Sequence, residues 1–225
     1  MELKNPFGIN NFLNADSASE IYQHTNQLLA QSDFTTQGLL KQFKVQMVGT
    51  TDDPADSLEY HKAILAQKIE LKVKPSFRPD KSLMIGDADI YRAYIQKLST
   101  ASGIKITDVE SLLAALRNRI EFFAAHGCSI SDHGLTSIPS KVTLTDEQKI
   151  EYVQLLKGEV NYFSDTDAFA GYVLTEVCKM YHEKGWVQQF HLGAIRNNNH
   201  GMMRKLGPDT GYDSIGDFKQ AESLS

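Results

Sequence analysis

The feature that most limits the possible folds is a short apolar strand with a polar end. Around residues 185–199 a glycine ends a helix, the segment Trp186–His191 follows as a strand, and an arginine and three asparagines come soon after. Three earlier segments repeat this order of strand and polar end. Because the carboxyl ends of parallel strands meet at one mouth in a (β/α) barrel, such repetition is typical of an active site on that fold.

Helices are expected between the strands, because apolar residues recur there at helical spacing. The predicted strands are residues 45–48, 69–74, 128–131 and 186–191. The predicted helices are residues 14–31, 37–43, 56–67, 89–98, 107–127, 145–156 and 166–184, and residues 218–225 resemble the uncompleted opening of another. Capping boxes are predicted at Ser17 with Glu20, Thr107 with Glu110, and Thr145 with Gln148. A left-handed glycine is expected to end one helix at Gly127, and another helix is expected to stop at Gly185.

Strands that alternate with helices favour parallel pairing through right-handed crossovers. Four such strands make half of an eight-stranded barrel or an open doubly wound sheet. The sequence has no Gly-x-Gly-x-x-Gly or Walker loop, so the usual phosphate-binding reason for an open sheet is missing. We predict an α/β fold with a partial (β/α)8 barrel in one domain. Residues 1–44 form a helical lead-in, residues 45–200 form four strand–helix units, and residues 201–225 form a loop and the start of a helix.

Composition narrows the class of partner. The net charge is −5 without any block of like charges, which argues against a general affinity for nucleic acid or for an anionic membrane. An anionic small molecule stays compatible with this charge. The two cysteines form no framework, the start has no apolar signal region, and no stretch is long enough to span a bilayer. We therefore expect a soluble, cytoplasmic protein.

Polar side chains gather where the predicted strands end. In a barrel these ends converge on one mouth. The alternative is turn chemistry, since Asp, Asn, Ser and Pro suit turns wherever they occur. For Asp52 and Asp53, turn and capping roles stay open. For Asp132 and His133 a structural role is equally open, because neighbours can satisfy a polar strand end. The clusters are Thr50/Thr51/Asp52/Asp53, Ser76/Arg78/Asp80/Lys81, Asp132/His133 and His191/Arg196/Asn197.

His191 and Arg78 are the strongest candidates. His191 follows an uncharged strand, and we expect its ring to point into the mouth with little else to satisfy it. Arg78 lies between Phe77 and Pro79 in a rigid turn, where its planar fork suits a carboxylate; the alternative is an ion pair with Asp80.

The remaining histidines look structural. We expect His24, His61 and His182 on solvated helix faces and His126 at a helix end. No two histidines stand at His-x-His or His-x-x-x-His spacing, so the sequence predicts no metal ligands and no self-sufficient metal site.

Five segments together resemble the uronate isomerase family, also called glucuronate isomerase, of the amidohydrolase superfamily. The resemblance runs from Pro6 to the last residue, and the order of the segments makes it specific. They are Val48–Pro54, Ser76–Lys81, Ala124–Cys128 with Ser131–His133, Gly185–Asn199, and Gly207–Ser214.

The resemblance implies a distorted (β/α)8 barrel that interconverts D-glucuronate with D-fructuronate, and D-galacturonate with D-tagaturonate, in hexuronate catabolism. It also implies a divalent metal, usually zinc, held by a His-x-His pair on the first strand and an aspartate on the last. The chain contains neither, so its strands are expected to be numbers two to five. We therefore expect an internal fragment or an incomplete gene model that is inactive and aggregation-prone by itself.

The resemblance also implies roles for single residues. Arg78 matches the family's active-site arginine and is expected to bind the substrate's carboxylate or a hydroxyl. His191 matches the histidine at the mouth and is the expected catalytic residue. Five further residues are expected to shape the substrate pocket: His133, Arg196, Asn197, Asp52 and Asp53. A metal-dependent hydrolase of the superfamily and a non-catalytic product are the alternatives, and the oligomeric state, including a homo-oligomer, stays open.

Overall fold

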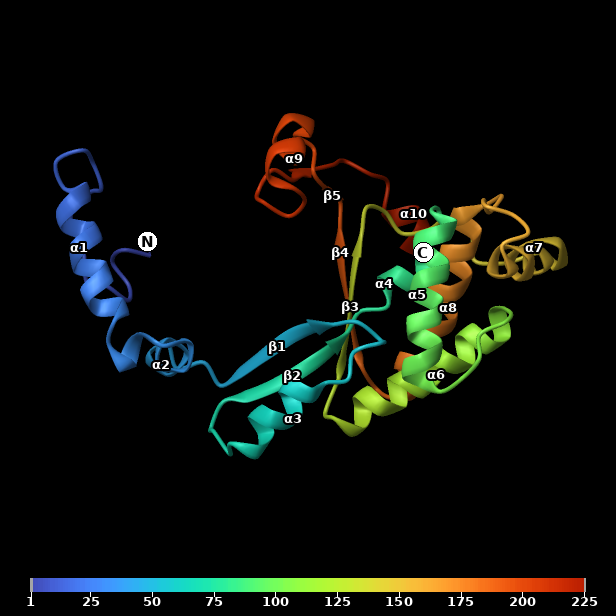
Figure 1. Ribbon diagram of the computed structural model, residues 1–225, viewed down its shortest axis with the longest axis horizontal. Coiled ribbons are helices and arrows are strands. Elements are labelled where there is room, and N and C mark those ends of the chain that lie inside the picture. Colours follow the sequence, from blue (N-terminus) through green and yellow to red (C-terminus); the bar gives the residue numbers. More distant parts are fainter. Residues whose placement is uncertain (1, 225) are drawn as a thin grey trace. The chain divides into compact units, whose positions relative to one another are not determined.

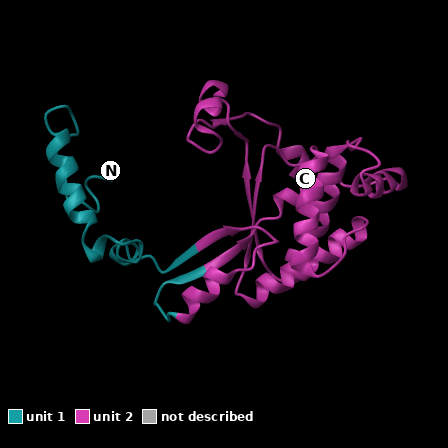
Figure 2. Ribbon diagram, viewed as in Figure 1, with its two compact units in different colours: residues 1–48, 67–73 teal, residues 49–66, 74–225 magenta. Residues whose placement is uncertain are grey.

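A computed structural model describes residues 2–224 (Figure 1). The chain divides into two units (Figure 2). Unit 1 comprises residues 1–48 and 67–73, and unit 2 comprises residues 49–66 and 74–225. No helix within residues 2–224 is both long enough and apolar enough to cross a membrane.

Unit 1 contains two predicted helices, α1 (Ala18–Leu29) and α2 (Thr36–Gln42), joined by a 3-10 turn, η1 (Ser32–Phe34). The predicted capping box at the start of α1 is wrong, because the Ser17 side chain makes no capping hydrogen bond. Asn14 takes this role instead: its side-chain oxygen accepts the amides of Asp16 and Ser17, both at 3.0 Å. An Asn side chain competes well for free amides just before a helix.

Four strands form one sheet in the order β1-β2-β3-β4, which is also their order along the chain. They are β1 (Met47–Asp52), β2 (Lys72–Phe77), β3 (Ile130–Leu135) and β4 (Val187–Leu192). β2 pairs with β3, and β3 with β4, in parallel (Figure 1). These pairs confirm the predicted parallel pairing of strands that alternate with helices.

The strands reach further toward the carboxyl end than the sequence predicts. β1 ends at residue 52 instead of 48, β2 at 77 instead of 74, and β3 at 135 instead of 131. The prediction ends each strand at its first polar residues. In the structure the neighbouring strand satisfies the backbone beyond that point, as where the Arg78 amide donates to the Asp52 carbonyl at 2.9 Å. Several polar residues of the clusters therefore lie within strands.

Helices connect the strands and follow the last one. Four of the predicted helices are confirmed within a few residues at each end: α3 (Glu59–Ala66), α5 (Ala88–Ser102), α7 (Asp146–Lys157) and α8 (Thr166–Glu183). The sequence did not predict α4 (Asp80–Leu83), α9 (His200–Leu206) or the antiparallel pair β5 (Ala194–Ile195) and β6 (Ser214–Ile215). The predicted terminal helix contains α10 (Ala221–Leu224), and Ser225 lies outside the described residues.

Helix α6 (Val109–Ala125) begins two residues after the predicted start, and its N-cap is Asp108 instead of Thr107. Its capping box joins Asp108 and Ser111, so the predicted Thr107/Glu110 pair is wrong; an aspartate is the stronger N-cap. The Thr145/Gln148 box of α7 is confirmed in both directions. Gly127 has a φ of +84°, which confirms the predicted left-handed position after α6. Helix α8 stops before Gly185 as predicted, and this glycine is also left-handed, with a φ of +68°.

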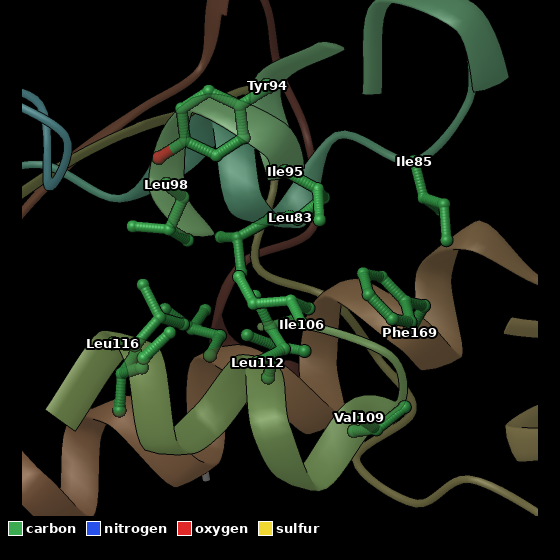
Figure 3. Packing of buried hydrophobic residues seen from close by; sticks show 14 of the residues in the cluster. Leu83, Ile85, Tyr94, Ile95, Leu98, Ile106, Val109, Leu112, Leu116 and Phe169 are labelled. Carbon is green, nitrogen blue, oxygen red and sulfur yellow. The ribbon is translucent and has the colours of Figure 1, made fainter. Parts of the chain in front are cut away.

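The core of unit 2 lies between the sheet and its helices and continues among α4, α5, α6 and α8 (Figure 3). Leu98 of α5 and Leu112 of α6 are completely buried there. Phe77, at the end of β2, packs edge-on against Phe123 of α6 with ring centroids 5.0 Å apart. Burial of such side chains supplies about 1.5–3 kcal/mol each, which fixes the strand end that precedes Arg78.

Candidate functional site

The two faces of β3 and β4 carry different chemistry. Side chains alternate between faces along a strand, so neighbours such as Asp132 and His133 point to opposite sides. Asp132 lies opposite Gln189 of β4 and contacts both Gln189 and His191. His133 lies opposite Phe190, and the two rings stack with centroids 5.1 Å apart. We name the first side the polar face and the second the apolar face.

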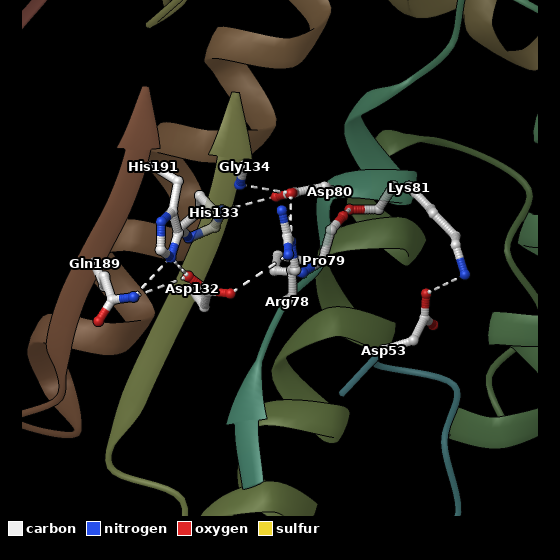
Figure 4. Close-up of polar contacts among 11 residues, drawn as sticks. Asp53, Arg78, Pro79, Asp80, Lys81, Asp132, His133, Gly134, Gln189 and His191 are labelled. Carbon is white, nitrogen blue, oxygen red and sulfur yellow. Dashed lines mark hydrogen bonds and ion pairs between the residues drawn. The ribbon is translucent and has the colours of Figure 1, made fainter. Parts of the chain in front are cut away.

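Asp132 is the centre of the polar face (Figure 4). Its Oδ1 lies 2.7 Å from His191 Nε2 and accepts from the Gln189 amide at 3.3 Å. Its Oδ2 lies 3.6 Å from Nη1 of Arg78. The Asp132 side chain is 7% exposed, whereas the His191 side chain is 55% exposed. The buried Asp132 carboxylate thus contacts both Arg78 and His191, while more than half of the His191 side chain is exposed to a ligand.

The expectation that His191 has little to satisfy it is therefore wrong. Besides Asp132, Nε2 of Gln189 lies 2.7 Å from His191 Nε2. Both partners come from the same face of adjacent strands, which the sequence shows only once the β3–β4 register is known. Even so, His191 and Arg78 meet at one carboxylate, although 113 residues separate them in the sequence of 225.

Arg78 makes the ion pair that the sequence offered as the alternative to a free fork. Its Nε donates to Asp80 Oδ2 at 2.9 Å. The guanidinium is nevertheless shared, because Nη1 faces Asp132 and the side chain is 28% exposed. Arg78 therefore lies between two carboxylates with part of its fork accessible.

Asp80 is almost buried, with 9% of its side chain exposed. Its oxygens accept hydrogen bonds from Arg78, from the Gly134 amide at 2.8 Å and from His133 Nδ1 at 3.2 Å. Burial raises the pKa of this carboxyl, but the hydrogen bonds from His133, Gly134 and Arg78 outweigh it and bring the pKa below its ordinary value of 3.8. Asp80 is thus a charged anchor.

The predicted pocket residue His133 lies on the apolar face. Its side chain is 0% exposed and packs near Tyr181 of α8, with ring centroids 5.8 Å apart. His133 is linked to the polar face indirectly: its Nδ1 contacts Asp80, which in turn pairs with Arg78.

Asp52 and Asp53 lie at the end of β1. Asp53 pairs with Lys81 at 3.1 Å and accepts from the Tyr94 hydroxyl at 3.2 Å, and burial together with the Asp53 charge raises the pKa of Tyr94. Asp53 also accepts the Ala55 amide at 2.9 Å, which is the turn role left open above. Asp52 accepts from the Thr50 hydroxyl at 2.6 Å.

His61 does not lie on a solvated face as expected. Its side chain is 11% exposed, and its Nε2 lies 2.7 Å from the Thr50 hydroxyl and 3.8 Å from Asp52 Oδ2. His61 lies on the side of α3 that faces β1. Helical spacing in the sequence does not show which polar residues of a helix contact a neighbouring strand.

Arg196 and Asn197 contact a second segment of the chain. Arg196 pairs with Asp213 at 2.6 Å, and the Asn197 amide donates to the same carboxylate at 2.9 Å. These two hydrogen bonds, the one from Asn197 first, lower the pKa of Asp213. The loop after β4 is thus tied to the segment that precedes β6.

Unit 1 has a groove of about 880 Å³. Its lining contains the four lysines Lys41, Lys44, Lys68 and Lys72 and one acidic residue, Glu70. The side chains of these residues are largely exposed, and none of the predicted site residues lines it.

Comparison with known proteins identifies the family. The family model described as glucuronate isomerase matches residues 1–225. The chain belongs to the glucuronate isomerase family. Curated relatives named uronate isomerase are 46% identical in Caldanaerobacter subterraneus subsp. tengcongensis and 42% identical in Bacteroides thetaiotaomicron, each across 100% of this chain and 48% of the relative. The chain thus spans about half the length of the curated relatives it matches.

Solved structures agree with this membership. The crystal structure of uronate isomerase from Thermotoga maritima is similar with a TM-score of 0.85 and 30% identity, over 99% of this chain and 49% of that one. Glucuronate isomerase from Caulobacter crescentus gives a TM-score of 0.84 and 29% identity, over 99% and 46%. The strand and helix arrangement of this chain is therefore that of about half of a glucuronate isomerase.

The family resemblance implies a divalent metal, but the described residues do not form a complete site for one. Within residues 2–224 no group of three His, Cys, Asp or Glu side chains is placed to hold a metal ion. The polar face offers Asp132 and His191, fewer than the three or four protein ligands that a zinc site uses. No chemical step is assigned to a metal held by this chain alone.

The sequence analysis left the role of Asp132 open and offered Asp80 only as an ion-pair partner of Arg78. The available signal was their spacing: Asp80 lies two residues after Arg78, and Asp132 directly precedes His133. Both were considered as members of polar clusters, but their role as shared acceptors depends on pairing across strands.

Proposed function

We propose that this chain serves uronate isomerisation, the interconversion of D-glucuronate with D-fructuronate and of D-galacturonate with D-tagaturonate. The observation that carries the proposal is the meeting of Arg78 and His191 at Asp132 on the open polar face, in a chain that matches the glucuronate isomerase family throughout. The reaction moves a proton between C2 and C1 of the sugar. It therefore needs a base, a donor for the sugar oxygen, and a group that holds the distal carboxylate.

Arg78 holds the substrate's carboxylate in this proposal. A guanidinium binds a carboxylate through two parallel hydrogen bonds, and the exposed part of the Arg78 fork is available for this contact. Asp80 and Asp132 flank the fork and keep its charge in place.

His191 exchanges the proton. Its ring is 55% exposed and lies against the buried Asp132 carboxylate, an arrangement in which the carboxylate orients the imidazole and stabilises its protonated form. In this proposal Asp52 and Asp53, at the end of β1, and Arg196 and Asn197, after β5, shape the substrate pocket, and His133 contributes through Asp80.

The proposal extends to the setting of the enzyme. It acts on a free sugar acid in hexuronate catabolism in the cytoplasm, where the free thiols of Cys128 and Cys178 are stable. A divalent metal, zinc by family resemblance, is bound with residues besides those described here, and a homo-oligomer is compatible with the proposal.

The test is an assay of the protein, as the cell produces it, with D-glucuronate and with D-galacturonate. The expected result is formation of the corresponding ketose. Arg78→Met is expected to lower kcat/KM at least about tenfold, since a charge-assisted contact contributes roughly 1.5–3 kcal/mol. Arg117→Met is the matched control, because Arg117 pairs with Glu183 on the surface of α6 and α8.

The second candidate is metal-dependent hydrolysis, as elsewhere in the amidohydrolase superfamily. Amide and ester substrates are therefore tested beside the two uronates. Hydrolysis without isomerisation would overturn the proposed function in favour of this alternative.

A further inference from the structure

Asp80 lies beside Arg78 in the proposed site but offers little surface to a substrate. It lies at the start of α4, three residues after Phe77, the last residue of β2, and its side chain is 9% exposed. Its Oδ2 accepts from Arg78 Nε and from the Gly134 amide, and its Oδ1 faces His133 Nδ1 (Figure 4). With both oxygens engaged and little surface open, the carboxylate is poorly placed to bind a substrate. It is well placed to hold Arg78.

The Gly134 amide gives Asp80 a rigid reference point. β2 pairs with β3 at Phe77 and Ser131 and ends there, so β2 supplies no partner for the backbone of β3 further along. Instead of a carbonyl of β2, the Asp80 carboxylate accepts the hydrogen bond from the Gly134 amide, at 2.8 Å. Gly134 itself lies opposite His191 in β4, so the carboxylate is bonded to a backbone that the sheet fixes on its other side.

His133 holds the other oxygen. A carboxylate can only accept, so the Nδ1 of His133 is the donor across the 3.2 Å contact. The ring is fixed between the stacked Phe190 and Tyr181 of α8. Among the described residues, Nε2 of His133 is buried without a hydrogen-bond partner. The imidazole is therefore used from one side, as a donor that orients Asp80.

The Arg78 fork also depends on the absence of a side chain at Gly134. A Cβ built at that glycine would lie 1.7 Å from Arg78 Nη2 and 2.9 Å from Cζ. The Nη2 end of the guanidinium thus lies close to the backbone of β3 at Gly134, with Asp80 on Nε and Asp132 facing Nη1. Gly134, Asp80 and Asp132 define its place, and the Asp132 carboxylate also contacts the His191 ring.

We propose that Asp80, oriented by His133 and the Gly134 amide, is a positioning residue that fixes the Arg78 guanidinium for the substrate's carboxylate. The inference rests on the proposed uronate isomerisation. It makes Asp80 act through Arg78 alone, and His133 act through Asp80. A long arginine side chain has many rotamers, and holding it in its binding geometry before the substrate arrives raises affinity.

A double-mutant cycle on the isomerase tests this order of action. Asp80→Asn keeps an oxygen for the Gly134 amide but removes the charge, and it is expected to lower kcat/KM about tenfold, mostly through a higher KM. In an Arg78→Met background the same change is expected to have no further effect. Equal fractional losses in both backgrounds would overturn the proposal. Glu183→Gln is the matched control, because it removes a carboxylate that pairs with Arg117 on the surface.

Two variants of His133 give an independent readout. The amide nitrogen of His133→Asn reaches the position of Nδ1, whereas that of His133→Gln reaches the position of Nε2. We expect His133→Asn to keep a near-normal KM and His133→Gln to raise it about as much as Asp80→Asn does. The reverse ranking would overturn the proposal, and this pair decides the question if Asp80→Asn does not fold. Absence of any isomerase turnover in the unaltered protein would instead overturn the proposed function, and the positioning role with it.

Discussion

The two faces of β3 and β4 are built from alternate residues of the same short strands, yet they serve opposite purposes. On the apolar face, His133 and Phe190 stack and lie against the aromatic layer of Phe77, Tyr181 and Trp186. On the polar face, Asp132, Gln189 and His191 contact one another and Arg78.

The polar side chains are held at defined positions because the opposite face of the same strands is tightly packed. Tight packing on the apolar face fixes the strand backbones, because interiors pack as densely as organic crystals. The fixed backbone then sets the position of each polar side chain on the other face, so these side chains do not need to be packed in a core themselves. Asp80 connects the two faces, since it contacts His133 on one side and Arg78 on the other.

The largest expected effect comes from damage to the apolar face. Phe77 is fully buried against Phe123, Tyr181 and Trp186, so Phe77→Ala is expected to lower the free energy of unfolding by about 3–5 kcal/mol. Urea unfolding measures this loss. Tyr162→Ala, at a largely exposed tyrosine, is the control and should change stability little. A loss of similar size in both variants would show that this face is not the main source of stability.

A substitution on the polar face should lower activity strongly and stability only slightly. Gly134→Ala places a methyl group against Arg78 Nη2, so the guanidinium must move, and kcat/KM is expected to fall at least about tenfold. The free energy of unfolding should change much less than in Phe77→Ala. Gly86→Ala is the matched control, because a Cβ there meets no atom within 4 Å. Full activity in Gly134→Ala would contradict the close contact between Arg78 and β3.

The link between the faces should appear as a smaller, pH-dependent effect. The folded-state pKa of Asp80 is lower than its ordinary value of 3.8. The stability that this carboxylate contributes is therefore complete above that value and is lost as pH falls through the folded pKa. Unfolding measured from about pH 5 down to about pH 3 should show a shallower decline in Asp80→Asn than in the unaltered protein. Identical slopes would mean that Asp80 is not held as a charged group.

The smallest effect concerns two thiols on the helix side of the sheet. Burial raises the pKa of Cys128 and of Cys178 to about 11. Both thiols should stay protonated near neutral pH, and iodoacetamide should alkylate them slowly until the protein is unfolded. Mass spectrometry of native and unfolded samples follows the reaction. Rapid alkylation of native Cys128 would show that water reaches the core behind β3.

The sequence predicts the fold better than it predicts the contacts. The alternation of strands and helices, most helix ranges and the Thr145/Gln148 box depend on local patterns, and the structure confirms them. The strand ends were wrong because Asp132 and His133 look like turn residues, whereas pairing with β4 continues the strand through both. Whether Asp132 or His133 points toward the mouth depends on the register between β3 and β4, which lie far apart in the sequence.

The site shows the same division. Arg78 and His191 stand out locally, one beside a proline and one at the end of an uncharged strand. Asp80 and Asp132 matter because of what reaches them from other strands, and no local pattern reveals that. Whether His191, Arg78 and the five bordering residues act on a substrate stays a prediction.

The most direct test of the central claim is a crystal structure of the protein with D-glucuronate bound. We expect the sugar's carboxylate within hydrogen-bond distance of the Arg78 guanidinium, and a sugar hydroxyl beside His191, on the polar face. A uronate bound instead in the lysine-lined groove of unit 1, with the polar face free of ligand, would contradict it.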